Sequence, residues 1–129
     1  MIRPATAADA PAIAAIWNPV IRDSAITFNT IEKTDADIAA LIGERQRAGH
    51  AVFVGLVDGT VAGFAQYGQF RAGVGYARAM EHTILLAPNA RGTGLGLALL
   101  AAVEAHARAG GAHVLIAAVS GENPDGIVF

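Results

Sequence analysis

The chain has 129 residues, 53% of them hydrophobic, and its 9 basic and 11 acidic side chains give a formal net charge of -2. This length fits one domain, 1–129, with a single core, and the charge balance gives no electrostatic basis for binding nucleic acid or an anionic membrane. The sequence contains no cysteine, which excludes disulfides, zinc thiolate sites and a cysteine nucleophile.

A short N-terminal strand and a first helix are expected at the start of the chain. Thr6 and Asp9 have the spacing of a capping box, and Pro11 is tolerated only within the first turn of the helix that follows. Four apolar side chains then share one helical face: Ile13, Ile16, Trp17 and Val20.

A second helix is predicted by the same capping pattern at Thr34 and Asp37, with an end near Gly49. One face of this helix carries Ile38, Leu41, Ile42 and Arg45. The basic residues in and around the two helices are expected to be ordinary solvated charges: Arg22, Lys33, Arg45 and Arg47.

The rest of the chain alternates strands with one long helix. Asp58-Gly59 is the signal of a two-residue type I′ hairpin, and it separates two strand-like runs. The expected elements are strands at 51–57, 60–67 and 77–86, a helix from the glycine loop to about 109, and a buried strand at 113–119. The order β, α, α, β, β, β, α, β predicts an α+β fold with a mixed, mostly antiparallel central sheet flanked by helices.

The most informative motif is the glycine-rich run Arg91-Gly92-Thr93-Gly94-Leu95-Gly96. Glycines allow close backbone approach to a ligand, and a helix N-terminus supplies unpaired N–H groups that suit phosphate oxygens. It is not a Walker A loop, because no Gly-Lys-Ser/Thr follows, and its spacing lacks the second gap of a Rossmann fingerprint. The motif therefore predicts a pyrophosphate site of another kind.

Arg91-x-x-Gly94-x-Gly96 resembles the Gln/Arg-x-x-Gly-x-Gly/Ala signature of the GCN5-related N-acetyltransferases (GNAT). Further segments look like those of phosphinothricin and methionine sulfoximine acetyltransferases, and they match in order along the whole chain. These are Trp17-Asn18-Pro19-Val20, Thr27-Phe28-Asn29, Tyr67-Gly68-Gln69-Phe70-Arg71, Met80-Glu81-His82-Thr83 and Ser120-Gly121-Glu122-Asn123.

The resemblance implies the GNAT acyl-CoA N-acyltransferase fold and transfer of acetyl from acetyl-coenzyme A to the amine of a small amino-acid-like substrate, without a metal. In this family a helix and two more strands follow the point where the sequence stops at Phe129. We therefore expect a domain incomplete at its C-terminus, lacking that last helix and those strands. Its uncovered sheet edge would favour a homodimer or poor solubility.

Glu81 is the predicted catalytic residue. A carboxylate in the middle of the otherwise apolar strand Met80–Ile84 has a raised pKa unless it is solvated or paired, which suits a base near neutral pH. The residue by itself is equally compatible with a solvent-facing position at a strand kink. The resemblance implies a general base acting through water, and His82 on the opposite strand face is expected to be structural or at the surface.

Acetyl-CoA contacts are implied for the main chain of Ile84, Leu85 and Leu86, whose side chains are expected in the core. The resemblance also implies cofactor contacts for the loop and for a later asparagine that is alternatively a turn or N-cap residue: Arg91, Gly92, Thr93, Gly94, Leu95, Gly96 and Asn123.

The implied substrate site centres on Arg71, whose guanidinium suits a carboxylate, with Gly75 and Tyr76 in the same loop. A second basic residue often found two positions on in the family is Gly73 here, so the anion contact is weaker or supplied differently. Phe28 either lines the pocket or packs on Trp17.

Three other functions compete with this enzyme: a coenzyme A binding module without full catalysis, an acetyltransferase for peptide N-termini, and a nucleotide-phosphate binding domain.

His106 and His113 have no partner visible in the sequence, so metal binding is not expected. With no apolar run of about 18 residues and no signal-peptide pattern at Met1–Pro4, we expect a cytoplasmic protein.

Overall fold

In the described part of the chain, five strands form one sheet in the order β1 (Ile2–Pro4), β2 (Val52–Val57), β3 (Thr60–Gln69), β4 (Ala79–Leu86) and β5 (Val114–Ala117). The computed structural model describes residues 1–23, 32–69, 79–111 and 114–117, and at 69, 79–81 and 114–117 it describes the backbone alone. Neighbouring strands from β1 to β4 are antiparallel, and β5 is parallel to β4. The expected α+β order and the mostly antiparallel sheet are confirmed.

The β2–β3 connection is the expected hairpin. Asp58 and Gly59 have φ angles of 51° and 78°, as a type I′ turn requires at both central positions. β3 runs two residues beyond the expected end at Tyr67, because Gly68 and Gln69 continue to pair with Glu81 and Met80 of β4.

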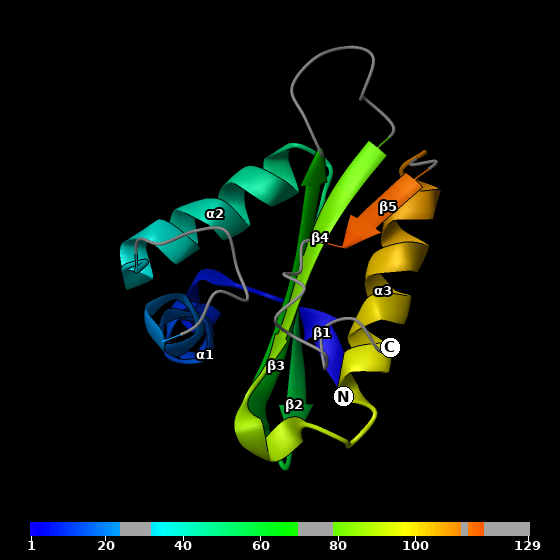
Figure 1. The fold of residues 1–129 in the computed structure, drawn as a ribbon. Helices are drawn as coiled ribbons and strands as arrows, with labels where there is room; N and C mark the ends of the chain where they lie inside the picture. The colour runs from blue at the N-terminus through cyan, green and yellow to red at the C-terminus, as the bar shows by residue number, and fades with distance from the viewer. Residues whose placement is uncertain (24–31, 70–78, 112–113, 118–129) are drawn as a thin grey trace.

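Helices cover both faces of the sheet (Figure 1). α1 (Ala10–Asp23) and α2 (Asp35–Arg47) lie on one face, and α3 (Leu95–Ala109) lies on the other. The α1/α2 face buries a cluster that includes Ile13, Trp17, Ile38, Val54 and Phe64. The α3 face buries a second cluster that includes Ala65, Tyr67, Ile84, Leu99 and Val103. No helix in the described ranges is long and apolar enough to cross a membrane.

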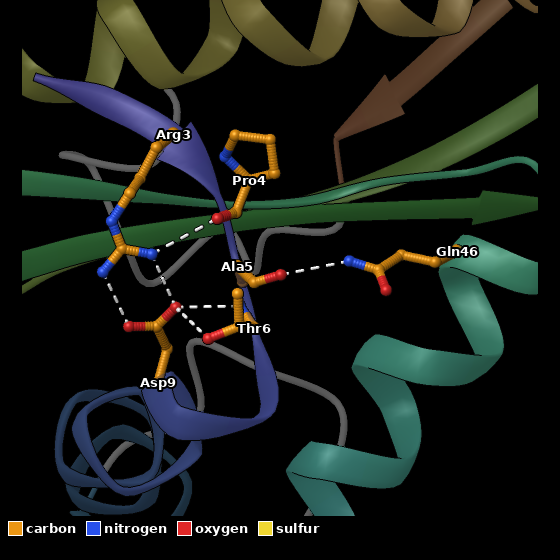
Figure 2. A network of polar contacts seen from close by, with 6 residues as sticks. All are labelled: Arg3, Pro4, Ala5, Thr6, Asp9 and Gln46. Carbon is orange, nitrogen blue, oxygen red and sulfur yellow. Dashed lines mark hydrogen bonds and ion pairs between the residues drawn. The ribbon is translucent and has the colours of Figure 1, made fainter.

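An ion pair joins the first strand to the first helical turn, η1 (Ala7–Asp9) (Figure 2). The Arg3 guanidinium donates to both Asp9 carboxylate oxygens at 2.8 and 2.9 Å, and the Thr6 N–H donates to Asp9 Oδ2 at 2.8 Å. The predicted capping box is therefore present, but it closes a 3-10 turn, and α1 starts at Ala10 with Pro11 in its first turn.

α2 is tied to the same corner of the molecule. Gln46 Nε2 donates to the Ala5 carbonyl at 3.0 Å (Figure 2). At the other end of α2, Thr34 and Asp37 form the predicted capping box, each side chain accepting from the other's backbone N–H at 3.0 Å. Gln46 therefore ties the C-terminal end of α2 to the chain after β1, and the capping box stabilises the N-terminal turn of the helix.

Candidate functional site

The start of α3 lies directly on the sheet because two strand positions are glycine. A Cβ added at Gly55 would lie 2.6 Å from Leu95 Cδ1, and one added at Gly63 would lie 2.7 Å from Leu86 Cδ2 and 3.3 Å from Leu95 Cδ2. Side chains at these positions would push the helix away. The two glycines therefore set where the N-terminus of α3 lies relative to the end of β4.

The glycine loop joins η3 (Pro88–Ala90) to α3. Gly92 and Gly94 have φ angles of 79° and 85°, a conformation that favours glycine, and a Cβ added at either would meet nothing within 4 Å. Thr93 Oγ1 donates to the Ala90 carbonyl and accepts from the Leu95 N–H, which ties the loop together.

The loop and helix start fit an anionic group. Within the described residues, the backbone N–H groups of Gly94, Gly96 and Leu97 donate no hydrogen bond. Unpaired N–H groups at the positive end of a 15-residue helix, beside open space, suit the oxygens of a pyrophosphate. The predicted placement of Gly92–Gly96 at a helix start is confirmed, and contact with a cofactor stays a prediction.

In the described residues, the pairing of β4 with β3 extends further along the strand than its pairing with β5. Its pairing with β3 continues to Leu86, whereas its described pairing with β5 ends at His82 opposite Ala117. In the described part of the chain, the backbone of 83–86 therefore has a strand partner on the β3 side alone. Contact of this main chain with a cofactor stays a prediction. Ile84 and Leu85 are buried, as expected for core side chains.

Glu81 lies in the middle of the sheet. Its backbone is opposite Gly68 of β3 and Ile116 of β5. The next residue, His82, is 6% exposed and opposite Tyr67, which belongs to the cluster on the α3 face. His82 is thus a buried histidine on the face that α3 covers, in agreement with a structural role.

Arg45 is not the solvated charge expected from the sequence. Its side chain is 27% exposed, and its Nε donates to Gln66 Oε1 at 3.0 Å. Gln66 Nε2 in turn donates to Thr83 Oγ1 at 3.2 Å inside the protein. The signal for this burial was present in the sequence, because Arg45 shares a helical face with Ile38 and Ile42, which are both buried.

Lys33 also differs from expectation. Its ammonium lies 4.8 Å from the centre of the Trp17 ring, which is a cation–π contact. Its backbone N–H and carbonyl both bond the Asn18 side chain at 2.7 Å. These contacts depend on residues far apart in sequence, so spacing gave no indication of them.

His106 has a partner that the sequence did not reveal. Its Nδ1 is hydrogen-bonded to the buried Tyr67 hydroxyl at 2.5 Å, and the His50 ring lies 5.2 Å from the Tyr67 ring. Burial raises the pKa of Tyr67. Burial is also the main cause that lowers the pKa of His50, with smaller contributions from the charges of Arg45 and His106.

The predicted substrate residues Phe28, Arg71, Gly75 and Tyr76, and the predicted cofactor contact Asn123, lie outside the described residues. The described ranges contain no group of three or more His, Asp or Glu side chains placed to hold a metal ion.

Comparison with known proteins identifies the fold. A model of the Acetyltransferase (GNAT) family matches residues 17–129. An L-methionine sulfoximine/L-methionine sulfone acetyltransferase from Pseudomonas paraeruginosa is 36% identical over 123 residues, which are 95% of this chain and 72% of that protein.

Two solved structures superpose on nearly the whole chain. A ribosomal-protein-alanine N-acetyltransferase from Brucella melitensis is 36% identical with a TM-score of 0.92, covering 98% of this chain and 78% of that one. A phosphinothricin acetyltransferase from Sinorhizobium meliloti, in complex with acetyl-CoA, is 30% identical with a TM-score of 0.92, and the match covers 98% of this chain and 69% of that one. Together with the family match, these likenesses show that the chain belongs to the GNAT family of acetyltransferases.

Proposed function

We propose that this chain transfers acetyl from acetyl-CoA to the α-amine of a small amino acid of the methionine sulfoximine, methionine sulfone or phosphinothricin type. The observation that carries the proposal is the glycine loop at the start of α3, where Gly92 and Gly94 have positive φ and an added Cβ at either would meet nothing within 4 Å. Relatives named for these substrates, and a neighbour solved with acetyl-CoA, support it.

In this proposal one set of residues binds acetyl-CoA, and Glu81 accepts a proton from the amine. Acetyl-CoA supplies an acyl group already activated as a thioester. The N–H groups of Gly94 and Gly96 would hold its pyrophosphate, with Arg91 at the edge of that site, and the main chain of Ile84–Leu86 would bond its amides. Acetyl-CoA bound in this way would present its thioester to the β4 segment that contains Glu81.

Glu81 would then act as the general base. The amine must lose a proton as its nitrogen bonds the acyl carbon and the carbon–sulfur bond breaks. The sulfur leaves as coenzyme A thiolate, which takes up a proton from solvent to become the thiol. We assign the acceptance of that proton to the Glu81 carboxylate, through a water molecule. The central position of Glu81 in the sheet, opposite Gly68, supports this role.

Glu81→Gln tests the assignment. We expect kcat for acetylation of L-methionine sulfoximine to fall by about 100-fold or more, while the dissociation constant for acetyl-CoA, from calorimetry, stays within a factor of about two. Glu104→Gln, at an exposed position of α3, is the matched control and leaves both unchanged. Normal turnover by Glu81→Gln would remove Glu81 from the mechanism.

A peptide N-terminus is the second candidate acceptor, because one structural neighbour is a ribosomal-protein-alanine N-acetyltransferase. Turnover of alanyl peptides faster than of free amino acids would favour it. Acetyl-CoA binding without turnover of either acceptor would indicate a coenzyme A binding module, and binding of ATP in preference to acetyl-CoA would indicate a nucleotide site.

We also propose a cytoplasmic homodimer. β5 is an edge strand of the described sheet, and a paired edge is protected from non-specific association. Sedimentation equilibrium is the direct test: a mass near twice 13.2 kDa supports the dimer, and a stable soluble monomer contradicts it.

A further inference from the structure

Arg45 reaches from α2 across β3 toward the β4 segment that carries Glu81. A Cβ added at Gly68 would lie 2.9 Å from Arg45 Cζ and 3.1 Å from its Nε and Nη1. The guanidinium therefore occupies the place that any other residue at position 68 would fill with its own side chain.

The residue directly opposite Gly68 in β4 is Glu81. In an antiparallel pair, opposite residues share one face of the sheet, with Cβ positions about 4.5–5.5 Å apart. The Arg45 guanidinium is therefore a direct cross-strand neighbour of the Glu81 position, on the face that α1 and α2 cover.

The Arg45 guanidinium is anchored through its Nε. Its Nε bonds Gln66, which is itself held by Thr83. Nη1 has one distant contact, 3.4 Å to a Glu44 carboxylate that is 67% exposed, and Nη2 has no acceptor within the described residues. An anchored arginine whose Nη2 has no acceptor in the described part of the chain is suited to bind a carboxylate.

We propose that Arg45 binds the α-carboxylate of the acceptor and so selects free amino acids over peptides and simple amines. This inference rests on the proposed function. In a free amino acid the amine and the carboxylate are attached to the same carbon, so an amine directed at Glu81 brings the carboxylate toward the neighbouring guanidinium. A peptide N-terminus has no carboxylate at that carbon.

The test compares L-methionine sulfone with its carboxamide, which keeps the amine and the side chain and removes the charge. In Arg45→Met we expect kcat/KM to fall roughly 10- to 100-fold for the acid and less than about threefold for the carboxamide. Arg47→Met, an exposed arginine of the same helix, leaves both values unchanged.

Gly68→Ala is the second variant, because its Cβ displaces the guanidinium without removing the charge. We expect the same selective loss on the acid, which keeps the inference testable if Arg45→Met fails to fold. An equal fall of kcat/KM for the acid and for the carboxamide would overturn the inference and leave the proposed function standing. A wild-type protein that acetylates neither acceptor would overturn the proposed function, and this inference with it.

Discussion

Leu95, the first residue of α3, packs on Gly55 of β2 so closely that an added Cβ would lie 2.6 Å from its Cδ1. Gly55→Ala should therefore destabilise the fold by about 1–3 kcal/mol through overpacking. The cost should largely vanish in a Leu95→Ala background, where the clashing methyl groups are absent. Urea unfolding of the two single variants and the double variant measures this coupling. An equal cost of Gly55→Ala in both backgrounds would contradict the packing described.

Gly94→Ala separates backbone strain from ligand binding. Gly94 and Gly59 both have positive φ, 85° and 78°, and open space around an added Cβ, so each substitution should cost about 1–2 kcal/mol of stability. Gly94→Ala should in addition weaken acetyl-CoA binding by about tenfold, or about 1.4 kcal/mol. Calorimetric titration compares the two variants. Equal affinities would show that the loop does not contact the ligand.

Asp9→Asn tests the ion pair at the N-terminus. The Arg3 guanidinium, helped by the Thr6 N–H, holds the pKa of Asp9 below its ordinary value. The ionised Asp9 therefore stabilises the fold fully above pH about 3.9, and this stabilisation is lost as the pH falls below that value. At pH 7 the variant should lose about 1–3 kcal/mol of unfolding free energy. The difference from wild type should shrink toward pH 3. Glu104→Gln, an exposed control, should change stability by less than about 0.5 kcal/mol.

His50→Phe should reduce the acid sensitivity of the fold. Burial lowers the pKa of His50, with Arg45 and His106 as nearby charges and Tyr67 as its ring neighbour. The native state thus binds this proton less readily than the unfolded chain, so stability is full above pH about 6.5 and falls below it. Tm measured from pH 7.5 to 5 should fall less in His50→Phe. Glu104→Gln, at an exposed position of α3, is the control and should keep the wild-type slope. An unchanged slope in His50→Phe would contradict the assignment.

Local chemistry in the sequence was sufficient to predict most of the fold. The capping boxes at Thr34 and Thr6, the Asp58-Gly59 turn and the glycines of the α3 loop each specify a short-range geometry that the structure contains. The start of α1 was less well predicted, because the Thr6 box closes a 3-10 turn before the helix proper.

Contacts between distant segments could not be predicted in the same way. Arg45 meets Gln66 and Gly68 through the packing of α2 on β3, and His106 meets Tyr67 across 39 positions. No sequence motif predicts either of these contacts. The helical register of Arg45 with Ile38 and Ile42 was the one available sign that this arginine lies against the sheet.

Release of coenzyme A thiol from acetyl-CoA, measured with and without L-methionine sulfone, tests the central claim most directly. We predict thiol release that depends on the amine, matches the N-acetyl product in amount, and is lost in Glu81→Gln. Acetyl-CoA binding with no amine-dependent thiol release would contradict it.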